Sequence, residues 1–199
     1  MTEARAKARP EPGESRFAQG FALFAECLLT GVWIAVAALG LVTYPAAFAA
    51  GARHLGRRLA HERGGWREFA ADFRAAVRHG WLVGVAGWAA LAVVWIDVRA
   101  VREGLPGGAA VGALGVLALI GAAVAGLRAA ADWRPGASWR SLLASAGRRT
   151  VLDPAGSFLL VGGLAVVVCS GWFSAPLAVA VLGAVAAAAV AVEERYRRR

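Results

Sequence analysis

The sequence lacks the short motifs by which many enzymes are identified. It has no HExxH zinc pair, no CxxC, no GxSxG turn and no GxxxxGK[ST] phosphate loop. Histidine is also scarce: His54, His61 and His79 fall in one arginine-rich stretch, where we expect solvated side chains and not a metal or acid–base site. We therefore predict no catalytic residue, no cofactor, no bound metal and no enzymatic activity.

Cysteine, lysine and acidic residues are few. The two cysteines, Cys27 and Cys169, stand in apolar runs and are expected to be small buried thiols, which argues against a disulfide framework. The 13 acidic residues are outnumbered by 22 Lys and Arg, of which Lys7 is the only lysine, for a net charge of +9. No groove-reading or base-stacking pattern accompanies the arginines, so nucleic-acid binding is not expected. Basic segments beside apolar runs instead set membrane orientation and meet anionic lipid.

Long apolar runs are what the sequence does contain. Hydrophobic residues make up 59% of the chain, and the charged residues cluster between the runs. Because about 20 apolar residues cross a bilayer core, the sequence predicts an all-α, polytopic membrane helix bundle with about five transmembrane helices in one domain, 20–193. The predicted spans are 21–50, 80–98, 108–128, 155–173 and 176–192. We expect a disordered N-terminal tail at 1–19 and a basic C-terminal tail at 194–199.

Pro45 stands near the end of the first predicted span. Proline removes a backbone donor and clashes with the preceding turn, so it predicts a helix kink here. Such a kink persists in lipid only where neighbouring groups satisfy the freed carbonyl oxygen. We therefore expect this end of the helix to pack inside the bundle.

Two long basic loops, 51–79 and 128–153, separate the spans. Trp66, Phe69 and Phe73 recur at helical spacing, which predicts an amphipathic helix that leads into the second span, and a short amphipathic helix is expected in the second loop. Most arginines lie in these loops and the C-terminal tail, so the positive-inside rule predicts that the N-terminus is out and the C-terminus is in. The arginines expected to contact lipid or a partner are Arg53, Arg57, Arg58, Arg148 and Arg149.

Glu26 is an acidic residue well inside the first predicted span. Ionisable residues in a membrane are costly and often functional. Asp97, Arg99 and Arg102 close the second predicted span on the same predicted side, so we hypothesise that Glu26 pairs with Arg99 or Arg102. The alternatives are a solvated interfacial carboxylate and a solute or proton site.

Several local motifs occur together, most of them in the first half of the chain. Trp33 stands in an apolar helix, Pro45-Ala46 follows about three turns later, and the run WREF at 66–69 with Phe73 leads directly into a span. Farther on, the run SLL at 141–143 is followed by Pro154 at the start of the fourth predicted span.

From Leu28 to about Val98 the chain resembles the YesL-like family of uncharacterised bacterial integral membrane proteins, and the stretch from Ser141 to Pro154 resembles that family's second loop. The resemblance covers most of the chain and implies a location in a bacterial plasma membrane. That family often has Asn where this chain has Thr30, and Gly where this chain has Tyr44. The resemblance implies about five spans and a neighbourhood of carbohydrate uptake and breakdown genes. It also implies an auxiliary role beside sugar ABC importers.

Two functions are compatible with these observations. The first is a non-enzymatic accessory or interaction protein linked to carbohydrate uptake, whose partners are anionic membrane lipids, ABC transporter subunits or further copies of itself. The second is a small oligomeric solute transporter or channel, with Glu26 and the Pro45 kink on its path. An accessory protein predicts a closed bundle, whereas a transporter predicts a polar cavity that reaches Glu26.

Overall fold

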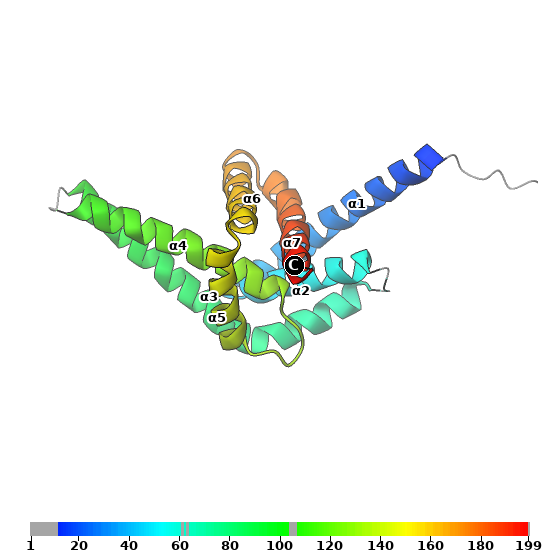
Figure 1. Ribbon diagram of the computed structural model, residues 1–199, viewed down its shortest axis with the longest axis horizontal. Helices are drawn as coiled ribbons and strands as arrows, with labels where there is room; N and C mark the ends of the chain where they lie inside the picture. Colours follow the sequence, from blue (N-terminus) through cyan, green and yellow to red (C-terminus); the bar gives the residue numbers. More distant parts are fainter. Residues whose placement is uncertain (1–11, 61, 63, 104–106, 199) are drawn as a thin grey trace, which may run out of the picture.

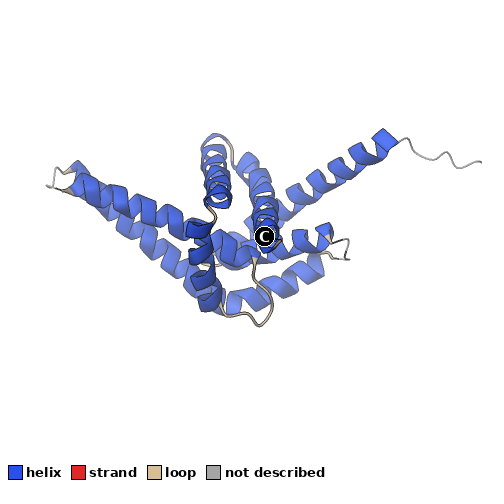
Figure 2. Ribbon diagram, in the orientation of Figure 1, coloured by secondary structure: helices blue, strands red, loops and turns tan. Residues whose placement is uncertain are grey.

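The computed structural model describes residues 12–60, 62, 64–103 and 107–198, and in that part of the chain every regular element is a helix (Figures 1 and 2). Five helices, including α1 from Gly20, are long and apolar enough to cross a membrane. The chain is thus an all-α, multi-pass membrane protein, as the apolar runs predicted. The helices are α1 (Pro12–Ala38), α2 (Tyr44–Leu59), α3 (Trp66–Arg102), α4 (Gly108–Ala131), α5 (Trp139–Leu152), α6 (Pro154–Phe173) and α7 (Ala175–Arg197).

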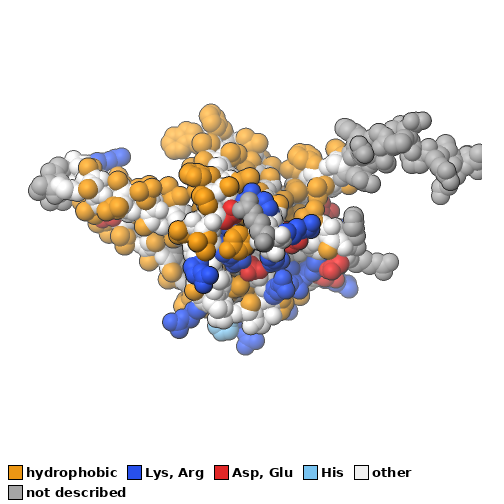
Figure 3. Space-filling model, in the orientation of Figure 1, with side chains coloured by type: hydrophobic (Ala, Val, Ile, Leu, Met, Phe, Trp, Pro, Cys, Tyr) orange, Lys and Arg blue, Asp and Glu red, His pale blue; other side chains and the backbone are white. Residues whose placement is uncertain are grey.

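The long helices spread from a common base. Figure 1 shows α3 and α4 leaving it as one hairpin, α6 and α7 as a second, and α1 as a single arm. We call the region where they meet the polar base: α2, residues 66–79 of α3, the C-terminal ends of α4 and α7, and residues 132–153, which include α5. Figure 3 shows charged side chains gathered there and apolar ones covering the hairpins. Apolar side chains on the hairpins suit the hydrocarbon core of a bilayer, and charged side chains in the base suit its interface with water.

The first predicted span is wrong in its second half. Helix α1 ends at Ala38, a turn follows with Leu41 at φ +56°, and Pro45 stands in the first turn of α2. Proline is tolerated there because the first N–H groups of a helix have no intrahelical partner. Pro45 therefore begins a helix and does not kink one, and the predicted loop at 51–59 is the remainder of α2.

The turn between α1 and α2 packs against the apolar part of α3. The Thr43 hydroxyl donates to the carbonyl of Ala37 at 2.7 Å, and the indole Nε1 of Trp88 donates to the carbonyl of Leu41 at 2.9 Å. Gly84 lets the chain come this close, because a Cβ there would lie 1.9 Å from the carbonyl oxygen of Val42. Neighbouring groups thus satisfy the carbonyls that the broken helix exposes, as a break at this depth requires.

Helix α3 joins two predicted elements. The amphipathic segment at 66–79 and the second span form one helix of 37 residues, about 55 Å long. The predicted helix in the second loop is α5, and the predicted break before the last span lies at Ser174, between α6 and α7. Helix α1 begins at Pro12, inside the stretch predicted to be disordered, whereas residues 1–11 lie outside the described residues.

Two glycines let α1 and α7 cross in contact. A Cβ on Gly31 would lie 2.2 Å from the carbonyl oxygen of Val179, and a Cβ on Gly183 would lie 1.8 Å from that of Cys27. Small residues at such a crossing let two backbones meet where no hydrophobic force between helices operates. The crossing fixes the arm α1 beside the second hairpin.

Candidate functional site in the polar base

Arg128 is the centre of a buried ion-pair cluster. It stands in the last turn of α4 with no exposed surface, 3.0 Å from Asp153 at the start of α6 and 3.1 Å from Glu193 on α7. A buried guanidinium needs such partners because an unpaired charge in a low-dielectric interior is costly. The cluster, which we call the Arg128 cluster, ties three helices together at one point.

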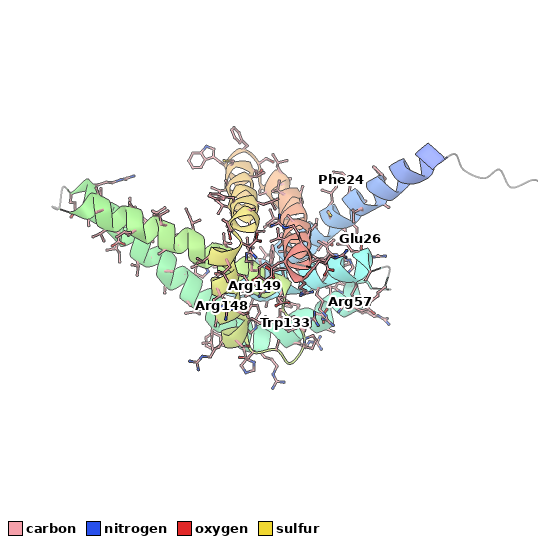
Figure 4. All side chains as sticks on the ribbon, viewed as in Figure 1. Phe24, Glu26, Arg57, Trp133, Arg148 and Arg149 are labelled. Carbon is pink, nitrogen blue, oxygen red and sulfur yellow. The ribbon has the colours of Figure 1, made fainter. Side chains whose placement is uncertain are left out.

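Further arginines close the Arg128 cluster from outside. Arg149 on α5, labelled in Figure 4, pairs with Glu193 and lies 3.2 Å from Asp132. Arg195 lies 3.2 Å from Asp153. Burial acts to raise the pKa of Asp153, but the hydrogen bond from Arg128 and the nearby positive charges hold this pKa below its ordinary value. Asp153 therefore stays ionised at neutral pH. The arrangement clamps α4, α5, α6 and α7 together.

Glu26 belongs to a second cluster, and its predicted partners are wrong. Its carboxylate lies 2.7 Å from Nε2 of His54 and 2.9 Å from Nε of Arg58, both on α2. No ion pair joins Glu26 to Arg99 or Arg102 in the described part of the chain. The reason is topological: α1 packs along α2, whereas Arg99 and Arg102 end α3 near the far tip of the first hairpin (Figure 1).

The residues predicted to surround Glu26 are arranged separately. Arg99 lies over the ring of Trp95, 4.5 Å from its centroid, which is a cation–π contact within α3. Asp97 lies one turn after Val94 and faces Gly115 of α4. These residues cap the hairpin tip and do not form a site with Glu26.

Aromatic side chains cover the Glu26 cluster. His54 is fully buried, with the ring of Trp33 at 5.0 Å between centroids and edge-on to it. Trp33 also contacts Trp66 at 5.6 Å and Phe69 at 5.3 Å. The face predicted to be interfacial is thus partly used inside the protein: Phe69 is buried, whereas Trp66 keeps about half of its surface exposed. Nδ1 of His54 has no hydrogen-bond partner among the described residues.

Most arginines predicted to contact lipid or a partner are engaged inside the chain. Arg53 lies 3.2 Å from Asp72, Arg57 pairs with the same carboxylate, and Arg58 pairs with Glu26. Arg149 belongs to the Arg128 cluster, and Arg148 is exposed. Pairing across α2 and α3 explains why an arginine-rich segment can pack closely.

Two cavities open on the polar base. The α2/α7 cavity has a volume of about 970 Å³ and includes Glu62 and Glu194 in its wall. The α3/α5 cavity has a volume of about 820 Å³ and lies between residues 71–83, Trp133, residues 136–138 and the start of α5. The arginines of the α2/α7 cavity are Arg53, Arg57, Arg134, Arg195, Arg197 and Arg198. In the α3/α5 cavity they are Arg74, Arg78 and Arg140, beside His79.

Sequence reasoning missed the partners in both clusters. His54 stands 28 residues from Glu26, and Arg128 stands 65 residues from Glu193, so no local spacing links them. Their position in the sequence could have indicated a pairing, because Arg128 and Glu193 each stand where a long apolar run ends. Charges at such ends need partners if the ends pack together.

The described residues were also compared with the arrangements of side chains that bind metal ions. No group of three or more His, Cys, Asp or Glu side chains there is arranged to hold a metal ion. No protein-family model matches the chain, and neither a curated protein nor a solved structure matches it.

Proposed function

We propose that this multi-pass membrane protein is a non-enzymatic accessory or interaction protein that acts through its polar base. One observation carries the proposal: every ion pair in the described part of the chain lies in the polar base or joins α1 to it. A pre-organised charged surface offers a partner fixed groups at little ordering cost. The long helices anchor this surface in the bilayer.

The partner that we propose is the membrane portion of a sugar ABC importer. The resemblance of Trp33, Pro45 and the WREF segment to the YesL-like family supports this choice. The α2/α7 cavity, with arginines and glutamates in one wall, supplies both charge signs for a polar protein contact.

Co-purification tests the accessory role. The tagged full-length protein, extracted from its native membrane in mild detergent, should retain importer membrane subunits. Neutralising two exposed arginines of the cavity, Arg134→Gln with Arg198→Gln, should reduce this retention, whereas Arg102→Gln at the hairpin tip should not. Absence of importer subunits from the wild-type preparation would reject the proposed partner.

The orientation that we propose is N-terminus out and C-terminus in, in a bacterial plasma membrane. The ends of α2, α5 and α7 bring most arginines to one side, as the positive-inside rule requires of a cytoplasmic face. A C-terminal fluorescent-protein fusion should fluoresce and a C-terminal alkaline phosphatase fusion should be inactive. The opposite pattern would invert the topology.

A transporter is the second candidate, and the Glu26 cluster favours it. A carboxylate on a spanning helix contacts a fully buried histidine whose other ring nitrogen has no partner among the described residues. Such pairs occur in proton relays. Liposomes with the purified protein should be tested for sugar and proton flux, comparing wild type with Glu26→Gln. Flux that falls in the variant would replace the accessory proposal with a transporter.

A further inference from the structure

The α3/α5 cavity differs from the α2/α7 cavity in its charge balance. Its wall contains Arg74, Arg78 and Arg140 with His79, and no acidic residue. In the α2/α7 cavity, by contrast, two glutamates stand among the arginines, and Arg53, Arg57, Arg195, Arg197 and Arg198 all take part in ion pairs. The two cavities therefore present different electrostatic surfaces at the same end of the molecule.

The three arginines of the α3/α5 cavity make no ion pair and no side-chain hydrogen bond within the described residues. All three are exposed to the surroundings. On the face drawn in Figure 3, basic side chains along the lower edge stand apart from the acidic ones. Because the nearby carboxylates are taken up elsewhere, the positive charge of this cavity is left for an external anion.

Two buried tryptophans, Trp133 and Trp139, form the floor of the cavity. The indole of Trp139 donates to the carbonyl of Ala76 at 3.2 Å and packs over Gly80, where a Cβ would lie 3.2 Å from the ring. Trp133 stacks on Trp139 with 6.5 Å between ring centroids, and both are buried. The arginines are thus carried by α3 and α5 on a fixed aromatic support, which lowers the cost of ordering a bound group.

The cavity also spans the boundary between the charged and apolar parts of α3. The polar first part of α3 ends at His79, and the apolar stretch begins at Gly80. Leu82 and Val83 from that stretch, with Leu143 of α5, line the same cavity as the arginines. A ligand that fits both ends has an anionic head and a hydrocarbon body.

We propose that the α3/α5 cavity binds the phosphate headgroup of an anionic phospholipid, with Arg74, Arg78 and Arg140 around the phosphate and the acyl chains along Leu82. Guanidinium groups hold phosphate oxygens through paired N–H donors, and basic pockets beside spanning helices suit lipid headgroups. The inference rests on the membrane location of the chain and is independent of the accessory role.

The test uses the full-length protein, freed of native lipid in a non-ionic detergent. Native mass spectrometry and thermal unfolding are measured with phosphatidylglycerol, with phosphatidylcholine and with inorganic phosphate. Wild type should retain phosphatidylglycerol in preference to phosphatidylcholine and should be stabilised by it. Basic residues near an anionic surface contribute about a factor of five each, so the triple variant Arg74→Gln, Arg78→Gln, Arg140→Gln should bind roughly a hundredfold more weakly.

The matched control is Arg67→Gln, Arg134→Gln, Arg148→Gln. It removes the same charge from three exposed arginines of the same end that line no part of this cavity. It should keep the phosphatidylglycerol affinity within about threefold, since only long-range charge is lost. Equal loss in both variants would show a diffuse charge effect and overturn the site.

Two other outcomes would overturn the proposal. Equal binding of phosphatidylcholine would remove the anion preference, and equal stabilisation by inorganic phosphate alone would assign the site to a free anion. Should the triple variant aggregate, Arg140→Gln alone decides, because Arg140 is exposed on α5: binding about fivefold weaker supports the site, and unchanged binding rejects it.

Discussion

In the polar base, charged side chains of neighbouring helices are paired with one another, whereas the spanning hairpins touch through glycine and small apolar residues. Arg128 and Glu193 are fully buried in the base, yet only 6% of the most apolar stretch of α3 is buried inside the chain. The difference follows from the two solvents. Lipid satisfies an apolar surface without protein contacts, but a desolvated charge needs a protein partner.

The comparison teaches where the stability of the fold resides. The α3/α4 hairpin and the α6/α7 hairpin diverge as they leave the base (Figure 1), so contacts between them are concentrated at their roots. We therefore expect substitutions at the base to cost more than substitutions of similar size in the spans. The following predictions are ordered by the expected effect.

Arg128→Met should have the largest effect. It removes the shared partner of two buried carboxylates, and breaking a buried pair in this way costs about 3–5 kcal/mol. Unfolding in mixed micelles with increasing dodecyl sulfate measures the loss. Arg148→Met, the same substitution at an exposed arginine of α5, is the control and should change stability little. Equal midpoints for both variants would contradict the proposed role of the Arg128 cluster.

Gly183→Ala should have the next largest effect and is the strongest test within the spans. The new methyl would overlap the Cys27 carbonyl, so α1 and α7 must separate at a cost of about 1–3 kcal/mol. Gly162→Ala on α6 is the matched control, because nothing lies within 4 Å of its Cβ position. In the same unfolding assay, the stability of the control variant should equal or exceed that of wild type, since alanine favours a helix. A control that loses as much as Gly183→Ala would reject the close crossing.

Trp88→Phe should cost about 1 kcal/mol. It keeps an aromatic ring on α3 but removes the donor to the carbonyl of Leu41. Trp81→Phe, on the same helix and also partly exposed, is the comparison and should cost less. The difference between the two free energies of unfolding measures the contribution of the hydrogen bond at the turn. No difference would mean that this hydrogen bond adds nothing to stability.

Mild acid should have the smallest effect. The pKa of Asp153 is lowered in the folded state, so the stability that this residue contributes is present above the ordinary carboxyl pKa of about 3.9 and is lost as the pH falls through the lower, folded-state value. Between pH 8 and pH 5, Asp153 should therefore contribute no change to the midpoint of unfolding. A loss in that interval that Asp153→Asn abolishes would contradict the sign of the shift.

Local patterns predicted much of the fold. The apolar runs predicted the spans, and the spacing of Trp66, Phe69 and Phe73 predicted a helix that α3 contains. The gap between the predicted spans 155–173 and 176–192 includes Ser174, where the last turn lies. The end of α1 could not be predicted in the same way, because apolar residues continue past Ala38 and hydropathy does not distinguish a turn from a helix there.

The candidate site was less accessible to sequence reasoning than the fold. Glu26 was identified because an acid among apolar residues is conspicuous, but its partner depends on the return of α2 along α1, which no periodicity encodes. The same holds for the three arginines of the α3/α5 cavity, which have no ion-pair partner among the residues that the structure describes. Composition counts arginines, whereas only the fold decides which of them meet a carboxylate.

The turn between α1 and α2 has a consequence for how the protein is made. The carbonyl of Leu41 receives its hydrogen bond from Trp88, a residue 47 positions later in the chain. When Leu41 is added to the growing chain, that donor has not yet been synthesised. Helix α1 can therefore form before the turn after it gains this hydrogen bond, which requires that residue 88 has been made and that α3 has packed against the turn.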